Sequence, residues 1–176
     1  STINRQIKDI EKLVNEFSSF ARMPSPVFKK IDINAVVERA VNFYKMSSLN
    51  QILLSKSATK LTFNGDEEQL NRVFINLIKN SEDSLSEVRE KDVDFKGKIS
   101  IEIKHNNDNI IVALVDNGVG IEDTAKIMTP YFTTKKKGTG LGLPIVSKII
   151  NEHLGDIIIK NNFPGVKITI TLPKNN

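Results

Sequence analysis

Residues 70–84 read Leu-Asn-Arg-Val-Phe-Ile-Asn-Leu-Ile-Lys-Asn-Ser-Glu-Asp-Ser and predict an amphipathic helix. At 100° per residue, one face of this helix collects the residues expected in a core, namely Leu70, Val73, Phe74, Leu77, Ile78 and Ser81. Asn76, Asn80 and Asp83 fall together on a polar stripe at the border of that face. Asn is a mediocre helix former, so two Asn four residues apart suggest a task for their side chains. They either hydrogen-bond neighbouring loops or help to hold Mg²⁺ beside the phosphates of a nucleotide, since Mg²⁺ prefers oxygen ligands.

The pattern on either side of this helix, which we expect over residues 67–87, is that of an α/β domain. Strands are predicted at residues 28–33, 51–56, 60–63, 98–105, 109–116, 156–160 and 166–172, with a hairpin turn at 106–108. Further helices are predicted at 34–46, with Asn34 as the N-cap, and at about 140–153, closed by Gly155. The expected fold class is α+β, a mixed sheet with helices packed on one face.

A separate helix is predicted at the start of the chain. Its apolar residues follow the 4-3-4-3-4 spacing of a coiled coil or helical bundle and are Ile3, Ile7, Ile10, Val14, Phe17 and Ala21. Pro24 and Pro26 end the helix, because a proline lacks an N–H group and restricts the residue before it. The helix either docks on its own domain or forms half of a dimerising helical hairpin, which we prefer because the seam needs a partner. The expected boundaries are residues 1–26 for the hairpin part with its hinge and 27–176 for the second domain.

The composition excludes several classes of protein. The 176 residues are 39% apolar and 26% charged, which is typical of a globular domain. The absence of Cys excludes disulfides and thiolate chemistry, and two His nearly exclude a multi-histidine metal centre. Arg at only five positions, 6% aromatic residues and no Trp argue against nucleic-acid binding, although the net charge is +4. No apolar run approaches the roughly 20 residues of a membrane helix. The polar first turn lacks a secretory signal, so we expect a domain facing the cytosol.

Two glycine-containing motifs follow the second half of the predicted sheet. Asp116-Asn-Gly118-Val-Gly120 ends an apolar strand, and a carboxylate at the floor of an apolar pocket accepts a hydrogen bond from the six-amino group of adenine. The same residues also suit an ordinary turn. Residues 138–143, Gly-Thr-Gly-Leu-Gly-Leu, open a helix whose free N–H groups form an anion site for phosphates. The preceding lysines, residues 135–137, either add positive charge there or belong to a solvated loop.

The order and spacing of these motifs resemble the ATP-binding catalytic part of bacterial sensor histidine kinases. Residues 76–84 are similar to the family's N box, 116–120 to its G1 box, 130–135 to its F box and 138–143 to its G2 box. Residues 163–165 match its closing Gly turn. The short segment between the G1 and G2 boxes, together with residues 14–24, resembles the nitrogen-regulation kinases of the NtrY type. The fold implied by the resemblance is the Bergerat-type ATP-binding α/β sandwich, with one helix of a dimerisation hairpin before it.

The resemblance also implies a set of site residues for ATP and Mg²⁺. Asn76 and Asn80 would be the catalytic and metal-binding residues. The nucleotide-binding residues would be Asn80, Asp83, Asp116, Gly118, Gly120, Phe132, Thr134, Lys135, Gly138, Thr139, Gly140, Leu141, Gly142 and Leu143. ATP-hydrolysing relatives carry a Glu at the position of Asn76, and a neutral amide cannot take a proton from water. Phosphoryl transfer is therefore favoured over hydrolysis.

Neither histidine of the chain has the context of a phosphate acceptor, which in this family usually precedes an acidic residue. His105 precedes Asn106, and His153 precedes Leu154 in the last turn of a predicted helix, where His suits the helix dipole. We expect the acceptor on a helix upstream of this chain, in a homodimeric parent protein anchored in the inner membrane. The partner would be a response regulator. Two alternatives remain, a nucleotide-binding regulatory module without transfer activity and a serine kinase of the anti-sigma type.

Overall fold

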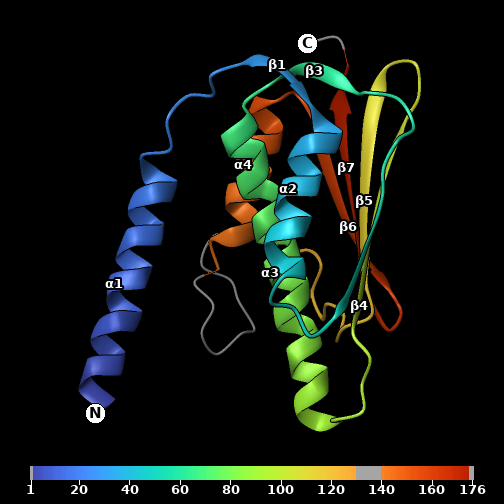
Figure 1. Ribbon diagram of the computed structural model, residues 1–176. Coiled ribbons are helices and arrows are strands. Elements are labelled where there is room, and N and C mark those ends of the chain that lie inside the picture. The colour runs from blue at the N-terminus through green and yellow to red at the C-terminus, as the bar shows by residue number, and fades with distance from the viewer. Residues whose placement is uncertain (1, 130–139, 175–176) are drawn as a thin grey trace.

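The computed structural model describes residues 2–129 and 140–174 (Figure 1). Along the chain the elements are α1 (Thr2–Ala21), β1 (Lys29–Asp32), α2 (Ile33–Lys45), β2 (Gln51–Ser55), β3 (Thr62–Gly65), α3 (Glu67–Lys91), β4 (Lys98–His105), β5 (Asn109–Asp116), α4 (Gly142–Glu152), β6 (Asp156–Asn162) and β7 (Gly165–Pro173).

Five of the strands form one mixed sheet in the order β2-β4-β5-β7-β6. β2 runs parallel to β4, and the other neighbours are antiparallel. Alternate residues of the central strands point to one face of the sheet and are buried there. These buried residues are Ile99, Ile101, Ile103, Ile110, Val112, Leu114, Ile168, Ile170 and Leu172. β1 and β3 form a separate antiparallel pair at one end of the molecule.

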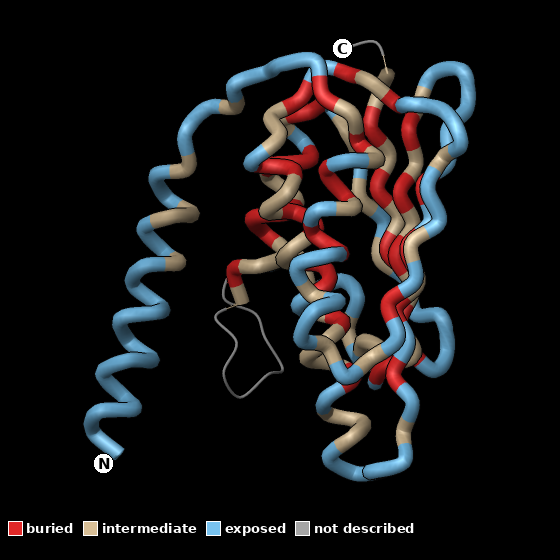
Figure 2. Tube along the Cα trace, viewed as in Figure 1, coloured by how far each residue is buried: buried red, intermediate tan, exposed pale blue. Residues whose placement is uncertain are grey.

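Helices α2, α3 and α4 cover the buried face of the sheet (Figures 1 and 2). α3 is the longest at 25 residues, and all six residues predicted for its core face are buried. The opposite face of the sheet carries the alternating half-buried and exposed residues of β4, β5 and β7. The predicted fold class, a mixed sheet with helices on one face, is confirmed.

Several predicted element ends differ from the structure; the strand predicted at 60–63, for example, is Thr62–Gly65. Asp32, not Asn34, caps α2, because the extended Asp32 places its carboxylate to accept the Asn34 N–H at 3.1 Å. α3 continues to Lys91 rather than to residue 87. α4 begins at Gly142 rather than 140, since Gly140 has a φ of 71°, which a helix cannot include. Gly155 closes α4 as predicted, because its N–H donates to the Ile150 carbonyl at 2.9 Å, while the left-handed conformation falls on Leu154.

Helix α1 leaves most of its apolar seam exposed. None of its residues is fully buried, and the seam residues from Ile3 to Phe17 are between 48% and 66% exposed. Figure 2 shows the exposed helix standing beside the α/β sandwich. The last turn of α1 contacts the domain through Ser19 and Phe20, whereas the earlier part of the seam stays exposed.

The segment after α1 is hydrogen-bonded to the start of α3. Gln69 Nε2 donates to the Pro24 carbonyl at 2.9 Å, and the Val27 N–H donates to Asp66 Oδ2 at 2.8 Å. Asp66 is also the N-cap of α3. Burial alone would raise the pKa of Asp66, but the N–H donors of Gln69, Val27 and Glu68 outweigh that effect and hold the pKa below its ordinary value. We call residues 22–28 the hinge segment.

His153 completes this corner of the fold. Its side chain is buried, its Nε2 accepts the Asp66 N–H at 2.9 Å, and its Nδ1 lies 2.7 Å from the Ile149 carbonyl. These two contacts require a neutral ring with the proton on Nδ1. The ring also meets Phe28 edge-on, with the centroids 5.1 Å apart. His153 therefore has a structural role, as expected, but as a buried neutral ring rather than as a charged partner of the helix dipole.

Candidate functional site

The polar stripe of α3 lies at the edge of the core. Asn76, Asn80 and Asp83 are all half-buried. The Asn76 Nδ2 group donates to the Arg72 carbonyl at 2.9 Å, which orients the amide and turns its oxygen away from the helix backbone. Asp83 accepts from Lys79 at 3.0 Å, one turn earlier on the same helix. The stripe thus has amide groups at its middle and an ion pair at its C-terminal end.

Asp83 also acts on a neighbouring tyrosine of α2. Burial raises the pKa of the Tyr44 hydroxyl, and the nearby carboxylates of Asp83 and Glu82 raise it further. Tyr44 therefore stays a neutral hydroxyl beside the stripe.

The beginning of α4 faces the two asparagines. A Cβ atom placed on Gly142 would lie 3.5 Å from Asn76 Oδ1 and 4.0 Å from Asn80 Nδ2. No side chain among the described residues caps this helix end, and the Leu141 side chain before it is fully buried. The first N–H groups of a helix carry partial positive charge and attract anions. Gly142 therefore brings this helix end close to the amides of Asn76 and Asn80, and the predicted residues Gly140, Leu141 and Leu143 flank it in sequence.

Asp116 is a buried carboxylate at the end of β5. It is 5% exposed, and its Oδ1 accepts the Gly118 N–H at 3.0 Å and the Val166 N–H at 3.4 Å. Its Oδ2 accepts the Ser81 hydroxyl at 2.8 Å. A carboxylate offers about four acceptor positions, so these donors do not exhaust it.

The turn after Asp116 needs its glycines. A Cβ on Gly118 would lie 2.1 Å from Ser84 Oγ, and Gly120 has a φ of 77°, which L residues rarely adopt. The loop is held on both sides, because Ser84 Oγ accepts the Val119 N–H at 3.0 Å, while Asn161 accepts from the Ile121 N–H and donates to the Ile121 carbonyl, both at 2.8 Å.

Sequence reasoning missed these serine contacts. Ser81 was placed on the core face of α3, and a polar residue among apolar ones was the available signal that a buried partner exists. Neither Ser84 nor Asn161 carried such a signal. Of the other predicted site residues, Phe132, Thr134, Lys135, Gly138 and Thr139 lie outside the described residues.

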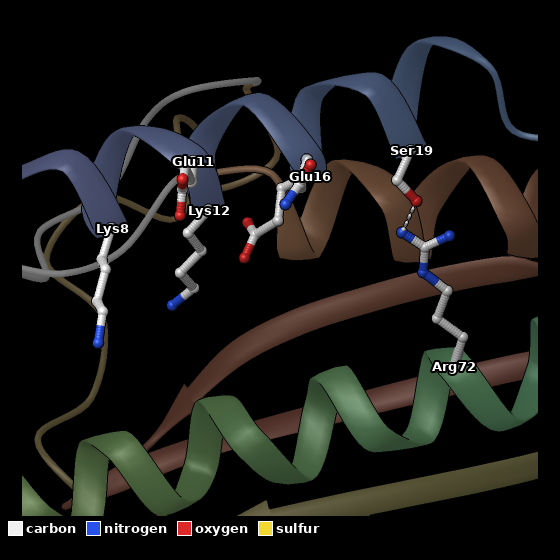
Figure 3. Close-up of a pocket in the computed structure, with 7 residues that line it drawn as sticks. Lys8, Glu11, Lys12, Glu16, Ser19 and Arg72 are labelled. Carbon is white, nitrogen blue, oxygen red and sulfur yellow. Dashed lines mark hydrogen bonds between the residues drawn. The ribbon is translucent and has the colours of Figure 1, made fainter.

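A cleft of about 550 Å³ lies between α1 and α3. Figure 3 shows the polar side chains of α1 that line it and Arg72 on α3, whose Nη2 donates to Ser19 Oγ at 2.7 Å. The lining residues are Lys8, Glu11, Lys12, Asn15, Glu16, Ser19 and Arg72. None of them belongs to the predicted nucleotide site. The cleft is therefore separate from that site and lies where α1 approaches α3.

The sandwich, its long helix α3 and the contacts of α3 with α4 and with the end of β5 match the catalytic-domain fold of histidine kinases. The chain belongs to the family of histidine kinase-, DNA gyrase B- and HSP90-like ATPases, whose model matches residues 65–176. The crystallised catalytic domain of histidine kinase ThkA has a TM-score of 0.74 and 27% identity, covering 85% of this chain and 99% of that one.

Relatives of known name are sensor proteins of the same group. Nitrogen regulation protein NtrY of Azorhizobium caulinodans is 34% identical over 176 residues, which are 97% of this chain and 23% of NtrY. An NtrY-like protein of Rickettsia conorii is 40% identical over 164 residues, 90% of this chain and 26% of its own length. The chain thus spans about a quarter of these relatives. No helix among residues 2–129 and 140–174 is both long and apolar enough to cross a membrane.

Proposed function

We propose that this chain is the ATP-binding catalytic module of a two-component sensor histidine kinase. In this proposal it transfers the γ-phosphate of ATP to a histidine on a dimerisation domain outside the chain, for relay to an aspartate of a response regulator. The observation that carries the proposal is the approach of the α4 N-terminus to Asn76 and Asn80, with Gly142 between them. Residues 27–176 would form this module and residues 1–26 the second hairpin helix with its hinge.

The part of the proposed nucleotide site that would bind the base, around Asp116, suits adenine. Asp116 has no proton to offer as a carboxylate, so its unused acceptor position suits the six-amino group of adenine and repels the six-carbonyl of guanine. The Gly118 turn places backbone rather than a side chain beside this carboxylate. These features favour ATP over GTP.

The phosphate end fits Mg²⁺ through oxygen donors. Among the described residues no group of three or more His, Cys, Asp or Glu could hold a metal ion. Mg²⁺ needs only one or two protein oxygens, because it keeps several waters, so the amides of Asn76 and Asn80 suffice. When bound, Mg²⁺ supplies charge neutralisation for phosphoryl transfer. Asn76 cannot act as a base towards water, which supports transfer rather than hydrolysis.

Partner assignments rest on the exposed seam of α1 and on the relatives. The seam has the spacing of a dimer interface and is unburied. A structure of ThkA in complex with the response regulator TrrA has this fold, with a TM-score of 0.79 and 23% identity. We propose a homodimeric parent that is anchored in the inner membrane by segments outside this chain and that phosphorylates a response regulator.

The test is the fate of the γ-phosphate. Incubated alone with labelled ATP and Mg²⁺, the chain should acquire no acid-labile phosphohistidine and should release phosphate only slowly. A longer protein that includes the upstream helix should become labelled on a histidine of that helix, and the same protein with Asn80→Ala should not. Labelling of His105 or His153, or brisk hydrolysis by the chain alone, would overturn the proposal. ATP binding without labelling of the longer protein would indicate a regulatory module instead.

A further inference from the structure

The buried hydroxyl of Ser81 makes a contact that the proposed mechanism does not use. Ser81 is 2% exposed and lies on the core face of α3, one residue after Asn80. A serine within a helix commonly returns its hydroxyl to the carbonyl four residues earlier. Here Ser81 Oγ instead crosses to β5 and donates to Asp116 Oδ2 at 2.8 Å. The two residues are far apart in sequence and both are buried, so this bond forms without competition from solvent.

The three donors around Asp116 come from three different parts of the fold. Oδ1 is held by backbone groups, the Gly118 N–H of the loop and the Val166 N–H of β7. The donor shown on Oδ2 is the hydroxyl of Ser81, a side chain of α3. The two backbone donors alone leave the carboxylate free to tilt about its Oδ1 end. Ser81 fixes the other end and therefore the plane of the group.

We infer that Ser81 is a positioning residue for adenine recognition, which directs the remaining acceptor position of Asp116 towards the six-amino group of the base. The inference rests on the proposed function. A hydrogen bond to a base is strongly directional, so a carboxylate that can tilt loses part of its preference for the amino group. Because Ser81 and Asn80 are consecutive on one rigid helix, α3 sets the placement of the base site and the phosphate site together.

The experiment compares ATP with purine riboside triphosphate, which lacks the six-amino group, by titration calorimetry. For the native chain ATP should bind more tightly than the purine analogue. Ser81→Ala should weaken ATP roughly tenfold, as expected for a bond to a charged group, and the analogue less than about twofold. Ser81→Cys keeps the shape of the side chain, but its thiol is a weak hydrogen-bond donor. It should therefore weaken ATP and spare the purine analogue as Ser81→Ala does. It serves as the test if Ser81→Ala folds badly. Ser81→Thr, which keeps the hydroxyl, should restore the preference for ATP.

Ser84→Ala is the matched control. Ser84 lies on the same helix and holds the same loop through the Val119 N–H, so its loss should weaken both nucleotides by the same factor. An equal loss of both nucleotides in Ser81→Ala, or an unchanged preference for ATP in Ser81→Ala and Ser81→Cys, would overturn the positioning role. If the native chain binds neither nucleotide, the proposed function itself fails, which is a different result.

Discussion

Asn80 and Asn76 share one face of α3, yet the structure shows different contacts for their amides. The Nδ2 of Asn76 is committed to the Arg72 carbonyl, which fixes its orientation, and Asn80 lies one turn further along, facing the start of α4. A metal held by amide oxygens binds only when phosphates supply further ligands. The effect of removing an amide should therefore depend on whether Mg²⁺ is present.

Asn80→Ala should reduce ATP affinity roughly tenfold in Mg²⁺ and much less in EDTA, because the lost oxygen serves the metal. Calorimetric titrations with and without EDTA measure both values. Asn42→Ala, an exposed asparagine of α2, is the matched control and should change neither. Equal losses in Mg²⁺ and EDTA would assign Asn80 to the nucleotide or to packing.

Residue patterns predicted the stripe of α3 and the burial of its core face, since helical periodicity fixes which residues share a side. They did not predict that Ser81 reaches Asp116, because the two residues lie on elements that only the tertiary fold brings together. The candidate site was thus foreseeable as motifs, whereas the hydrogen bonds between the motifs were not.

At the scale of elements, His153 links α4, the start of α3 and the hinge segment. Burial lowers the pKa of its ring below 6.5, and the bond to the Ile149 carbonyl and the charges of Asp66 and Glu152 oppose this only in part. The folded state therefore resists protonation where the unfolded chain accepts a proton. The contribution of His153 to the free energy of unfolding is fully present above pH 6.5. It decreases as the pH drops from 6.5 towards the lower pKa of the folded state.

The free energy of unfolding, measured with urea, should decrease between pH 7.5 and pH 5.5, by at most about 1.4 kcal/mol per pH unit from this residue. Asp66 does not add to the pH dependence in this range, because its pKa is lowered from 3.8. Its contribution to the free energy of unfolding is lost only at more acidic pH. His153→Gln should be less stable at pH 7.5 but should show a shallower pH dependence. An identical slope in both proteins would contradict the assignment.

Element ends were predicted less well than element cores. The hairpin of β4 and β5 was predicted with its observed bounds, because its two apolar runs alternate and enclose a polar turn. The start of α2 was misplaced because Asp32 and Asn34 are both good caps, and their backbone conformations decide between them. The start of α4 depends on a positive φ at Gly140, which composition alone does not reveal.

For the whole molecule, α1 is positioned by a few polar contacts and by Phe20 near its C-terminal end, which packs against the core. Arg72 of α3 reaches Ser19, and Gln69 holds the hinge segment. Such contacts near the surface contribute little to global stability. Sequence periodicity predicted the seam and its hinge, but not which side of α1 would face the domain, since that depends on single side chains.

Arg72→Ala should change the free energy of unfolding by less than about 0.5 kcal/mol and should speed hydrogen exchange in the last turn of α1. Arg39→Ala removes a comparable arginine, paired with Glu67 away from α1, and should leave that exchange unchanged. Mass spectrometry of deuterated peptides gives the rates. Equal exchange in the native chain and Arg72→Ala would show that other contacts position α1.

The residues of α1 that line the cleft and those of its apolar seam lie on opposite sides of the same helix. A body packed against the seam would therefore lie on the side of α1 that faces away from the cleft. Turning α1 by one residue position, about 100°, would carry Ser19 away from Arg72 and move the seam by the same angle.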